Sequence, residues 1–495
     1  MRKFPDRWLY FPILVLFIHF LYRLIDQSKI LRIFPLDYTN DWVSYMAHLT
    51  FLDKCGYSNL CPNWYNGIVT LKFSPPGWYF FTWPLHQLTN NVLFTSFISL
   101  LLMFFIGFVF FYFFGRSHQF SFTKILAFFI LFFGNAIVIG NFIRLGRINE
   151  LFAWMNFVPL AFILLKYKDH RINKNFFWII LFFSIIILSH QAVAILSSIL
   201  LLGLFLVKKG KEKLNVFLSA FAAFLLSSFW TVPYALNFFN TEAVNVIETI
   251  NSFSLDKSYI FQNLATWVIS LSFFIVFYIY WNSYNKSRKE LIFFSPTLII
   301  AFLLFTGLTF YIPILRFVFP DSHLYLFIFL SIYMLFKINY DLLNKTLKTI
   351  IFLGIIILPL ISIGINVIHT PYFIIPGDLE EDTIDVLNEV EGRFVMLTDG
   401  FYPTSYTRAY YSYAAIYLDK YTSSGFSQQY VTQEYFSRLM NLIKYFQEED
   451  ERLLENLNVL NTTEIISYDE GCEKLERFNF EERFKKGRVC LFTYN

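Results

Sequence analysis

Long apolar segments recur along most of this chain and restrict its fold more than any other feature. Between Trp8 and Val367, segments of about 18 or more residues carry few charged side chains, and each can cross a hydrocarbon layer about 30 Å thick. The chain has 65 Phe among 495 residues and only 15% charged residues, whereas soluble domains average about 25% charged residues. This pattern predicts a mainly α-helical, polytopic membrane protein.

Basic residues between the apolar segments predict the orientation, because Lys and Arg stay on the cytoplasmic side of membrane spans. Basic clusters lie at 2–7, 116–124, 166–174, 208–213, 286–289 and 337–348. An even number of crossings must join consecutive clusters, so the N-terminus is expected in the cytoplasm and the C-terminal part outside. About eleven spans follow, over 8–26, 92–114, 123–140, 150–166, 175–190, 191–207, 214–233, 263–281, 291–310, 320–336 and 348–368.

The apolar stretch 175–207 needs two spans rather than one, since basic residues flank it at both ends. The two short helices are expected to meet near His190. An ionisable side chain inside such a run is costly unless it lines a cavity. His190 is therefore a candidate site residue, with a satisfied packing residue as the alternative.

Residues 370–495 differ from residues 1–369 and predict a separate extracytoplasmic α/β domain. From Asp378 onward this part carries 22 acidic and 12 basic side chains and is therefore acidic. Because the whole chain has a net charge of +4, the membrane part before it must be basic. That basic part reports topology rather than nucleic-acid binding. Strands are expected at 393–399, 464–468 and 489–493 and a helix at 433–457.

Four cysteines fall in the segments predicted to lie outside, where disulfides persist. Cys55 and Cys61 lie in the first outer loop, and Cys472 and Cys490 lie in the C-terminal domain. Two local disulfides, or none, are the alternatives that the spacing leaves open. The spacing does not indicate a zinc site.

The first outer loop, residues 27–75, is too long for a plain connection and should carry its own structure. Asn40 is a suitable N-cap for a helix that starts at Asp41. Apolar residues from Trp42 to Leu52 share one helical face, while Asp41, Ser44 and His48 share the other. We expect an amphipathic helix in the membrane interface, and a second short helix that starts at Pro75 and Pro76.

Polar side chains at the outer ends of the spans are the candidates for chemistry. Asp41 and His48 lie two helical turns apart, so the carboxylate could take a proton from an acceptor hydroxyl while the imidazole orients a phosphate or sugar. Stabilisation of the helix start and a snorkelling His are the alternative reading. Arg suits phosphate recognition, although Arg at helix ends is commonly an interfacial anchor. The candidate donor- and substrate-binding residues are His48, Arg144, Arg147, Glu150, His190, Arg316 and His323.

Three segments of the first loop, residues 37–48, 63–67 and 73–79, resemble the first-loop signature of GT-C membrane glycosyltransferases. In that signature an acidic residue follows the first helix, and a Trp/Gly segment and a Pro-Pro helix start come later. Residues 147–150, 189–191, 313–317 and 425–429 resemble the prokaryotic membrane family labelled "6-pyruvoyl-tetrahydropterin synthase-related". Nothing in this sequence looks like the soluble zinc enzyme of that name.

The resemblance implies transfer of a sugar from a polyprenyl-phosphate-linked donor to an extracytoplasmic glycan, lipid or protein. It implies Asp41 as the catalytic base, Asp37 as a second acidic candidate, and Arg147 and Arg316 near the donor phosphate. The sequence departs from better-known families, because Asp37 and Asp41 replace the strict paired-acid signature and the Trp-Trp-Asp motif is absent. No metal ligand is assigned, and a divalent cation, Mg²⁺ or Mn²⁺, stays an open requirement.

Two other classes of function compete with the enzyme. A transporter or flippase for lipid-linked or polysaccharide cargo would need access from both sides and a polar pathway through the bundle. A non-catalytic membrane scaffold would leave Asp41, Arg147 and His190 far apart. The absence of a nucleotide-binding fingerprint, a phosphate-binding Gly-rich loop and a Gly-x-Ser-x-Gly elbow argues that any activated donor is lipid-borne or arrives outside by other means.

Overall fold

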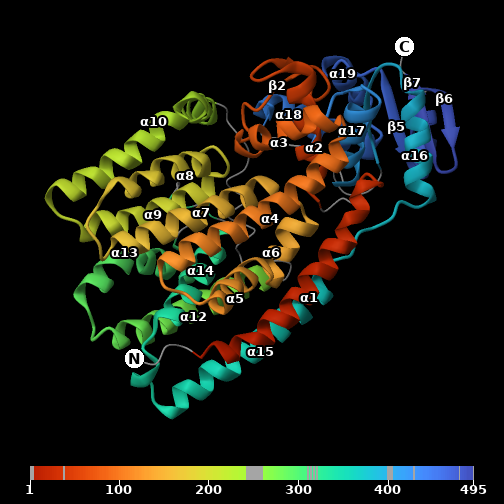
Figure 1. The fold of residues 1–495 in the computed structure, drawn as a ribbon. Helices are drawn as coiled ribbons and strands as arrows, with labels where there is room; N and C mark the ends of the chain where they lie inside the picture. Colours follow the sequence, from red (N-terminus) through yellow and green to blue (C-terminus); the bar gives the residue numbers. More distant parts are fainter. Residues whose placement is uncertain are drawn as a thin grey trace.

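The computed structural model describes residues 5–36, 40–240, 260–308, 312, 315, 318, 321–398, 405–426, 430–478 and 480–493. Long helices form a bundle, and a smaller domain with a sheet stands at one end of it (Figure 1). The expected fold class, a mainly helical membrane bundle followed by an α/β domain, is confirmed.

The bundle helices coincide with the predicted spans, because each span is a long apolar segment bounded by polar residues. Long helices are α1 (Tyr10–Gln27), α4 (Val92–Ser117), α7 (Ile148–Tyr167), α10 (Gly210–Asn240), α12 (Ile260–Ser283), α13 (Arg288–Phe305) and α15 (Lys345–His369). Shorter helices are α5 (Phe122–Phe133), α6 (Ala136–Val138), α8 (Trp178–Ile187), α9 (Gln191–Val207) and α14 (Ser322–Lys337). Short 3-10 turns lie at Asp6–Leu9, Ser28–Leu31, Lys174–Phe177 and Tyr340–Leu342.

Within the described part of the chain, six helices have the length and composition of a membrane span. A seventh arises if α5 and the segment Ala136–Arg144, which meet at 50°, form one bent span, while α9 and α14 are apolar but shorter. The predicted break at His190 is confirmed, since α8 ends at Ile187 and α9 starts at Gln191. The number of crossings, about eleven, and the orientation stay predictions.

The interior of the bundle is filled by phenylalanine side chains from α4, α5, α7 and α14. Phe128 contacts Phe111 at a ring-centroid distance of 4.9 Å, Phe162 at 5.6 Å and Phe329 at 4.9 Å. Offset and edge-to-face contacts of this kind fill space without polar atoms. These rings come from four helices that lie side by side in the middle of the bundle (Figure 1).

The first outer loop folds into α2 (Trp42–Cys55), the short strand pair β1 (Leu60–Cys61) and β2 (Ile68–Val69), and α3 (Gly77–Thr89). The second predicted helix is confirmed, because α3 starts directly after Pro76. The prediction of an interfacial amphipathic α2 is wrong, since its residues from Trp42 to Leu52 are buried except for the half-buried Tyr45. The reason is tertiary: α17 (Ser405–Tyr417) of the C-terminal domain packs along α2, and α4 also contacts it.

The C-terminal domain is built on a five-stranded mixed sheet in the order β4-β3-β5-β7-β6. Its strands are β3 (Arg393–Met396), β4 (Tyr421–Thr422), β5 (Glu464–Tyr468), β6 (Glu481–Lys486) and β7 (Val489–Thr493). β3 pairs in parallel with β4 and β5, and β7 pairs antiparallel with β5 and β6. The helices are α16 (Asp378–Glu389), α17, α18 (Gln433–Glu448), α19 (Arg452–Val459) and α20 (Glu470–Arg477).

The first loop and the C-terminal domain share one hydrophobic core. Phe51 and Trp64 from the loop lie in the same buried cluster as Leu442 and Phe492 from the domain. Both predicted cysteine pairs are disulfides, Cys55–Cys61 on the loop side and Cys472–Cys490 between α20 and β7. The outer loop is therefore packed as part of the C-terminal domain as well as of the bundle.

Candidate active site

A single π-helical turn, Ile139–Arg144, organises the end of the bundle next to α2. The carbonyl of Ile143 accepts a hydrogen bond from the Trp42 indole at 3.1 Å, and the carbonyl of Leu145 accepts one from the Asp41 amide at 2.5 Å. Gly146 follows with φ of +75°, a conformation that an L side chain rarely adopts. The turn therefore brings the start of α2 against Arg147, the residue that precedes α7.

Arg147 lies among three carboxylates that come from separate parts of the sequence. Its Nη1 donates to Asp321 Oδ1 at 2.7 Å and lies 3.9 Å from Glu150 Oε2, while its Nε lies 4.0 Å from Asp41 Oδ2. Burial lowers the pKa of Arg147, but Asp321, Glu150 and Asp41 outweigh that effect and raise it overall. The guanidinium therefore stays charged and holds the ends of α2, α7 and α14 together.

Asp41 is the most accessible of these carboxylates. Its side chain keeps 41% of its surface exposed, against 10% for Asp321 and 2% for Glu150. The dense protein around it nevertheless raises its pKa above the ordinary value for Asp, an effect that the cations Arg147 and Arg408 oppose. Such a carboxylate can both reach a substrate and accept a proton at a pH nearer neutrality.

Glu150 and Asp321 are fixed by neighbours that leave them little freedom. Glu150 Oε1 accepts hydrogen bonds from Ser322 Oγ at 2.6 Å and from the Trp154 indole at 3.2 Å. Asp321 accepts a further hydrogen bond from the side-chain amide of Asn141, which lies on the π-helical turn. These two carboxylates therefore serve to position Arg147, and Asp41 keeps the largest exposed surface of the three.

His190 lies at the same end of the bundle, as predicted. It precedes α9, and the charges of Glu150, Arg147 and Asp321 all act on it. Its Nδ1 is buried and has no hydrogen-bond partner among the described residues. The adjoining α3 is held close to this break, because the Gly77 amide donates to the Leu188 carbonyl at 2.7 Å.

His48 lies away from the Arg147 cluster, in a cage of aromatic rings. Its ring lies 5.3 Å from Trp64, 5.1 Å from Tyr430 and 6.1 Å from Tyr79. Its Nδ1 donates to the Ser44 carbonyl at 2.8 Å, and burial lowers its pKa to about 4, so the imidazole is neutral. No group in the described part of the chain pairs with the buried Nε2, which as the unprotonated nitrogen can accept a hydrogen bond.

Arg144 points to a different place from Arg147, although the two are three residues apart. Its Nε donates to the carbonyl of Pro371 at 3.0 Å, and Arg23 Nη2 donates to the same carbonyl at 2.9 Å. Both arginines therefore hold the chain that leads from α15 into the C-terminal domain. His323 is buried and has Thr266 Oγ1 at 3.0 Å from its Nε2, and its predicted contact with substrate stays a prediction.

Two of the predicted site residues, Asp37 and Arg316, lie outside the described residues. Among the described ones, no group of three or more His, Cys, Asp or Glu side chains is arranged to hold a metal ion, and Arg147 lies between the carboxylates.

Two charged partners of this site, Asp321 and Arg408, are not predicted from the sequence as members of it. Asp321 stands out as a polar residue at an outer span end, but nothing local indicates that it pairs with Arg147. Arg408 lies on α17, far along the chain, and acts electrostatically on Asp41. Contacts of this range have no signal in a single sequence.

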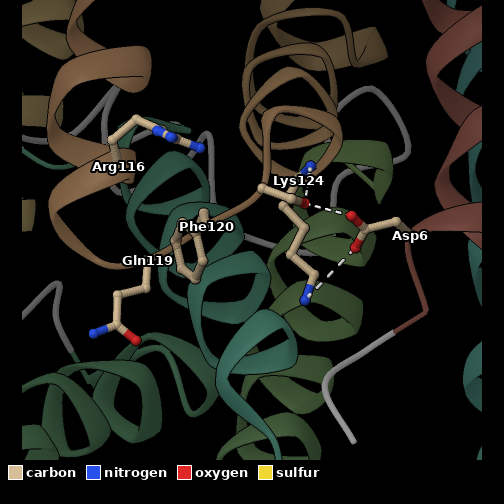
Figure 2. A pocket seen from close by; sticks show the side chains of 6 residues that line it. Asp6, Arg116, Gln119, Phe120 and Lys124 are labelled. Carbon is tan, nitrogen blue, oxygen red and sulfur yellow. Dashed lines mark hydrogen bonds and ion pairs between the residues drawn. The ribbon is translucent and has the colours of Figure 1, made fainter.

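A hollow of about 540 Å³ lies at the other end of α4 and has different chemistry. Figure 2 shows Asp6 beside Lys124, with Arg116 and Gln119 on the other side of Phe120. Asp6 accepts a hydrogen bond from Ser121 Oγ at 2.5 Å and lies 3.8 Å from Lys124 Nζ. Since α4 is about 39 Å long at 1.5 Å per residue, this hollow is separate from the Asp41 site.

The chain resembles a known family in sequence and solved structures in fold. Residues 71–371, more than half of the chain, match the family described as "6-pyruvoyl-tetrahydropterin synthase related domain; membrane protein". No curated protein matches the chain by sequence.

Two solved structures resemble the whole fold. The arabinofuranosyltransferase AftD from Mycobacteria has a TM-score of 0.55 at 11% identity, and the match covers 99% of this chain but 40% of that one. The oligosaccharyltransferase of Archaeoglobus fulgidus in its apo form has a TM-score of 0.52 at 11% identity, covering 95% of this chain and 71% of that one. Both are GT-C glycosyltransferases, so the predicted GT-C fold is confirmed.

Proposed function

The chain belongs to the 6-pyruvoyl-tetrahydropterin synthase-related family of membrane proteins, and we propose that it is a membrane glycosyltransferase that uses a lipid-linked sugar donor. The observation that carries the proposal is the cluster of Asp41, Arg147, Glu150 and Asp321 at the end of a GT-C bundle. The acceptor is a glycan, lipid or protein outside the cytoplasm. No part of the proposal requires nucleic acid.

Asp41 is the proposed catalytic base. It takes the proton of the acceptor hydroxyl while that oxygen forms a bond to the anomeric carbon of the sugar. The bond from the anomeric carbon to the donor phosphate breaks, and the polyprenyl phosphate leaves with the electron pair. Arg147 orients Asp41 from 4.0 Å and favours its ionised form.

The geometry favours this reading over its two rivals. A scaffold would leave the predicted polar residues scattered, whereas Asp41 and Arg147 are neighbours and the charge of Arg147 acts on His190. A transporter needs a polar pathway, whereas Phe111, Phe128, Phe162 and Phe329 pack against one another inside the bundle. A partly exposed carboxylate at one end of such a bundle suits transfer at a membrane surface.

The pH dependence of transfer should report on Asp41. The base must be ionised, so activity is lost as pH falls through its pKa. Because burial raises that pKa, kcat/KM should begin to fall at a pH above the ordinary range for an exposed Asp. The measurement is kcat/KM against pH with the intact protein in detergent; an acid limb at the value of a free Asp would contradict the proposed environment.

The sidedness of the protein can be measured directly. Lys444→Cys lies on α18, and Lys289→Cys lies at the start of α13, on the predicted cytoplasmic side; the two lysines are 60% and 41% exposed. The native cysteines are all in disulfides, so each variant adds one free thiol. A membrane-impermeant maleimide should label only Lys444→Cys in intact cells and both variants after lysis. The reverse pattern would overturn the proposed outer location of the site.

A further inference from the structure

The charge around Arg147 raises a problem for any anionic donor. One guanidinium faces the carboxylates of Asp41, Glu150 and Asp321, and its shortest contact, 2.7 Å, is already used by Asp321. With all three carboxylates ionised the cluster is negative overall. A phosphate placed beside Arg147 alone would be repelled more than attracted, because Coulomb energies grow as solvent is excluded. Another cation near Asp41 is needed to hold a phosphate.

Arg408 is a described cation whose charge acts on Asp41. It lies on α17, which packs along α2. α17 is tied to the first outer loop further along, where the Trp64 indole donates to the Tyr411 carbonyl at 3.2 Å and Lys54 Nζ donates to the Ala415 carbonyl at 3.2 Å. The position of Arg408 relative to the site is therefore fixed by packing.

Arg408 is half-buried, and no described carboxylate forms an ion pair with it. Among the described residues, the structure gives its side chain no hydrogen bond and no ion pair, and its guanidinium lies 6.0 Å from the centre of the Phe426 ring. Arg147, by contrast, has three carboxylates, and Arg144 has a backbone carbonyl. An arginine whose five donors are unused is well suited to bind a phosphate from outside.

We propose that Arg408, supplied by the C-terminal domain, binds the phosphate of the lipid-linked donor beside Asp41. The inference rests on the proposed function, which it refines by naming the residue and the ligand chemistry. Arg147 then orients the base, and Arg408 neutralises the phosphate while the sugar is bound and as negative charge builds on the leaving oxygen. The C-terminal domain thus forms part of the donor site and is more than a platform for the acceptor.

Two proposals can be tested separately: that the donor is a lipid phosphate, and that Arg408 binds its phosphate. The experiment measures binding of farnesyl phosphate and of farnesol by the full-length protein in detergent. The wild type should bind farnesyl phosphate more tightly than farnesol, because only the former has the phosphate. Arg408→Ala should weaken farnesyl phosphate binding about 10- to 100-fold, as expected for losing a charge-assisted bidentate contact. Farnesol binding should not change.

Three variants act as controls. Arg408→Gln keeps the length of the side chain without its charge and should resemble Arg408→Ala, while Arg408→Lys should retain part of the affinity. Arg438→Ala, which removes an exposed arginine on α18 paired with Glu434, should bind as the wild type does. Thermal unfolding of each variant shows that the fold is kept, and Arg408→Gln carries the test if Arg408→Ala does not fold.

The outcomes are distinct. If wild type and both neutral variants bind farnesyl phosphate equally and more tightly than farnesol, the assignment of Arg408 is wrong while the lipid-phosphate donor stands. If wild type binds farnesyl phosphate no more tightly than farnesol, the lipid-linked donor itself is wrong, and the assignment of Arg408 falls with it.

Discussion

Replacing Asp41 by Asn should lower the rate of sugar transfer by about 10²- to 10⁴-fold, the usual contribution of a general base. The amide is the same size as the carboxylate but cannot take the proton of the acceptor hydroxyl. Its neighbours Arg147 and Leu145 keep their own anchors, since Arg147 still bonds Asp321 and the backbone amide of residue 41 still donates to Leu145. The loss should appear in kcat rather than in donor binding.

The measurement is transfer from a synthetic polyprenyl-phosphate sugar, with farnesyl phosphate binding and thermal unfolding in parallel. Asp53→Asn is the matched control, because Asp53 is an exposed carboxylate on the same helix α2. It should leave transfer unchanged. Wild-type turnover by Asp41→Asn, with the fold intact, would remove Asp41 from the mechanism.

Replacing Gly146 by Ala should be among the most destabilising single-methyl changes in the protein. A Cβ at this position would lie 2.3 Å from the Trp42 ring, and the backbone has φ of +75°. Left-handed strain and overpacking together should cost about 2–5 kcal/mol. Trp42 cannot move freely, because it is fully buried and its indole donates to the Ile143 carbonyl at 3.1 Å.

The same change should also disturb catalysis, because Trp42 and Arg147 flank Gly146 and Asp41 directly precedes Trp42. Thermal unfolding in detergent measures the stability, and transfer by the surviving folded protein measures the geometry. Gly354→Ala on α15 is the control, since a Cβ there meets nothing within 4 Å, and it should be neutral or slightly stabilising. If the Gly146→Ala protein is as stable and as active as the wild type, the close contact between Gly146 and Trp42 is not needed for stability or for transfer.

The sequence by itself predicted the features that depend on local chemistry. Apolar runs and basic loops gave the position of each bundle helix, because burial of apolar surface and backbone hydrogen bonding in a membrane both depend on contiguous residues. The strands β3, β5 and β7 are apolar and were predicted, whereas the edge strand β6 carries charges along its whole length and was missed.

The candidate site could be predicted only in part. Asp41, Arg147, Glu150 and His190 were expected at one end of the bundle, and the structure gathers them there. The same argument also included Arg144, but a π-helical turn directs it to Pro371 while Arg147 meets the carboxylates. Residue type and side of the membrane are the same for both, so only the backbone path separates their roles.

Tertiary structure alone decided the partners that give Asp41 its chemistry. Asp321 directly precedes α14 and Arg408 lies on α17, and no local pattern links either of them to the first outer loop. The same holds for α2. Its polar stripe predicted an interfacial helix, whereas in the structure α17 packs against it and most of its residues are buried. The spacing of residues in a helix predicts which of them share a face. Which element packs on that face depends on contacts with residues hundreds of positions away, and no short-range pattern predicts those contacts.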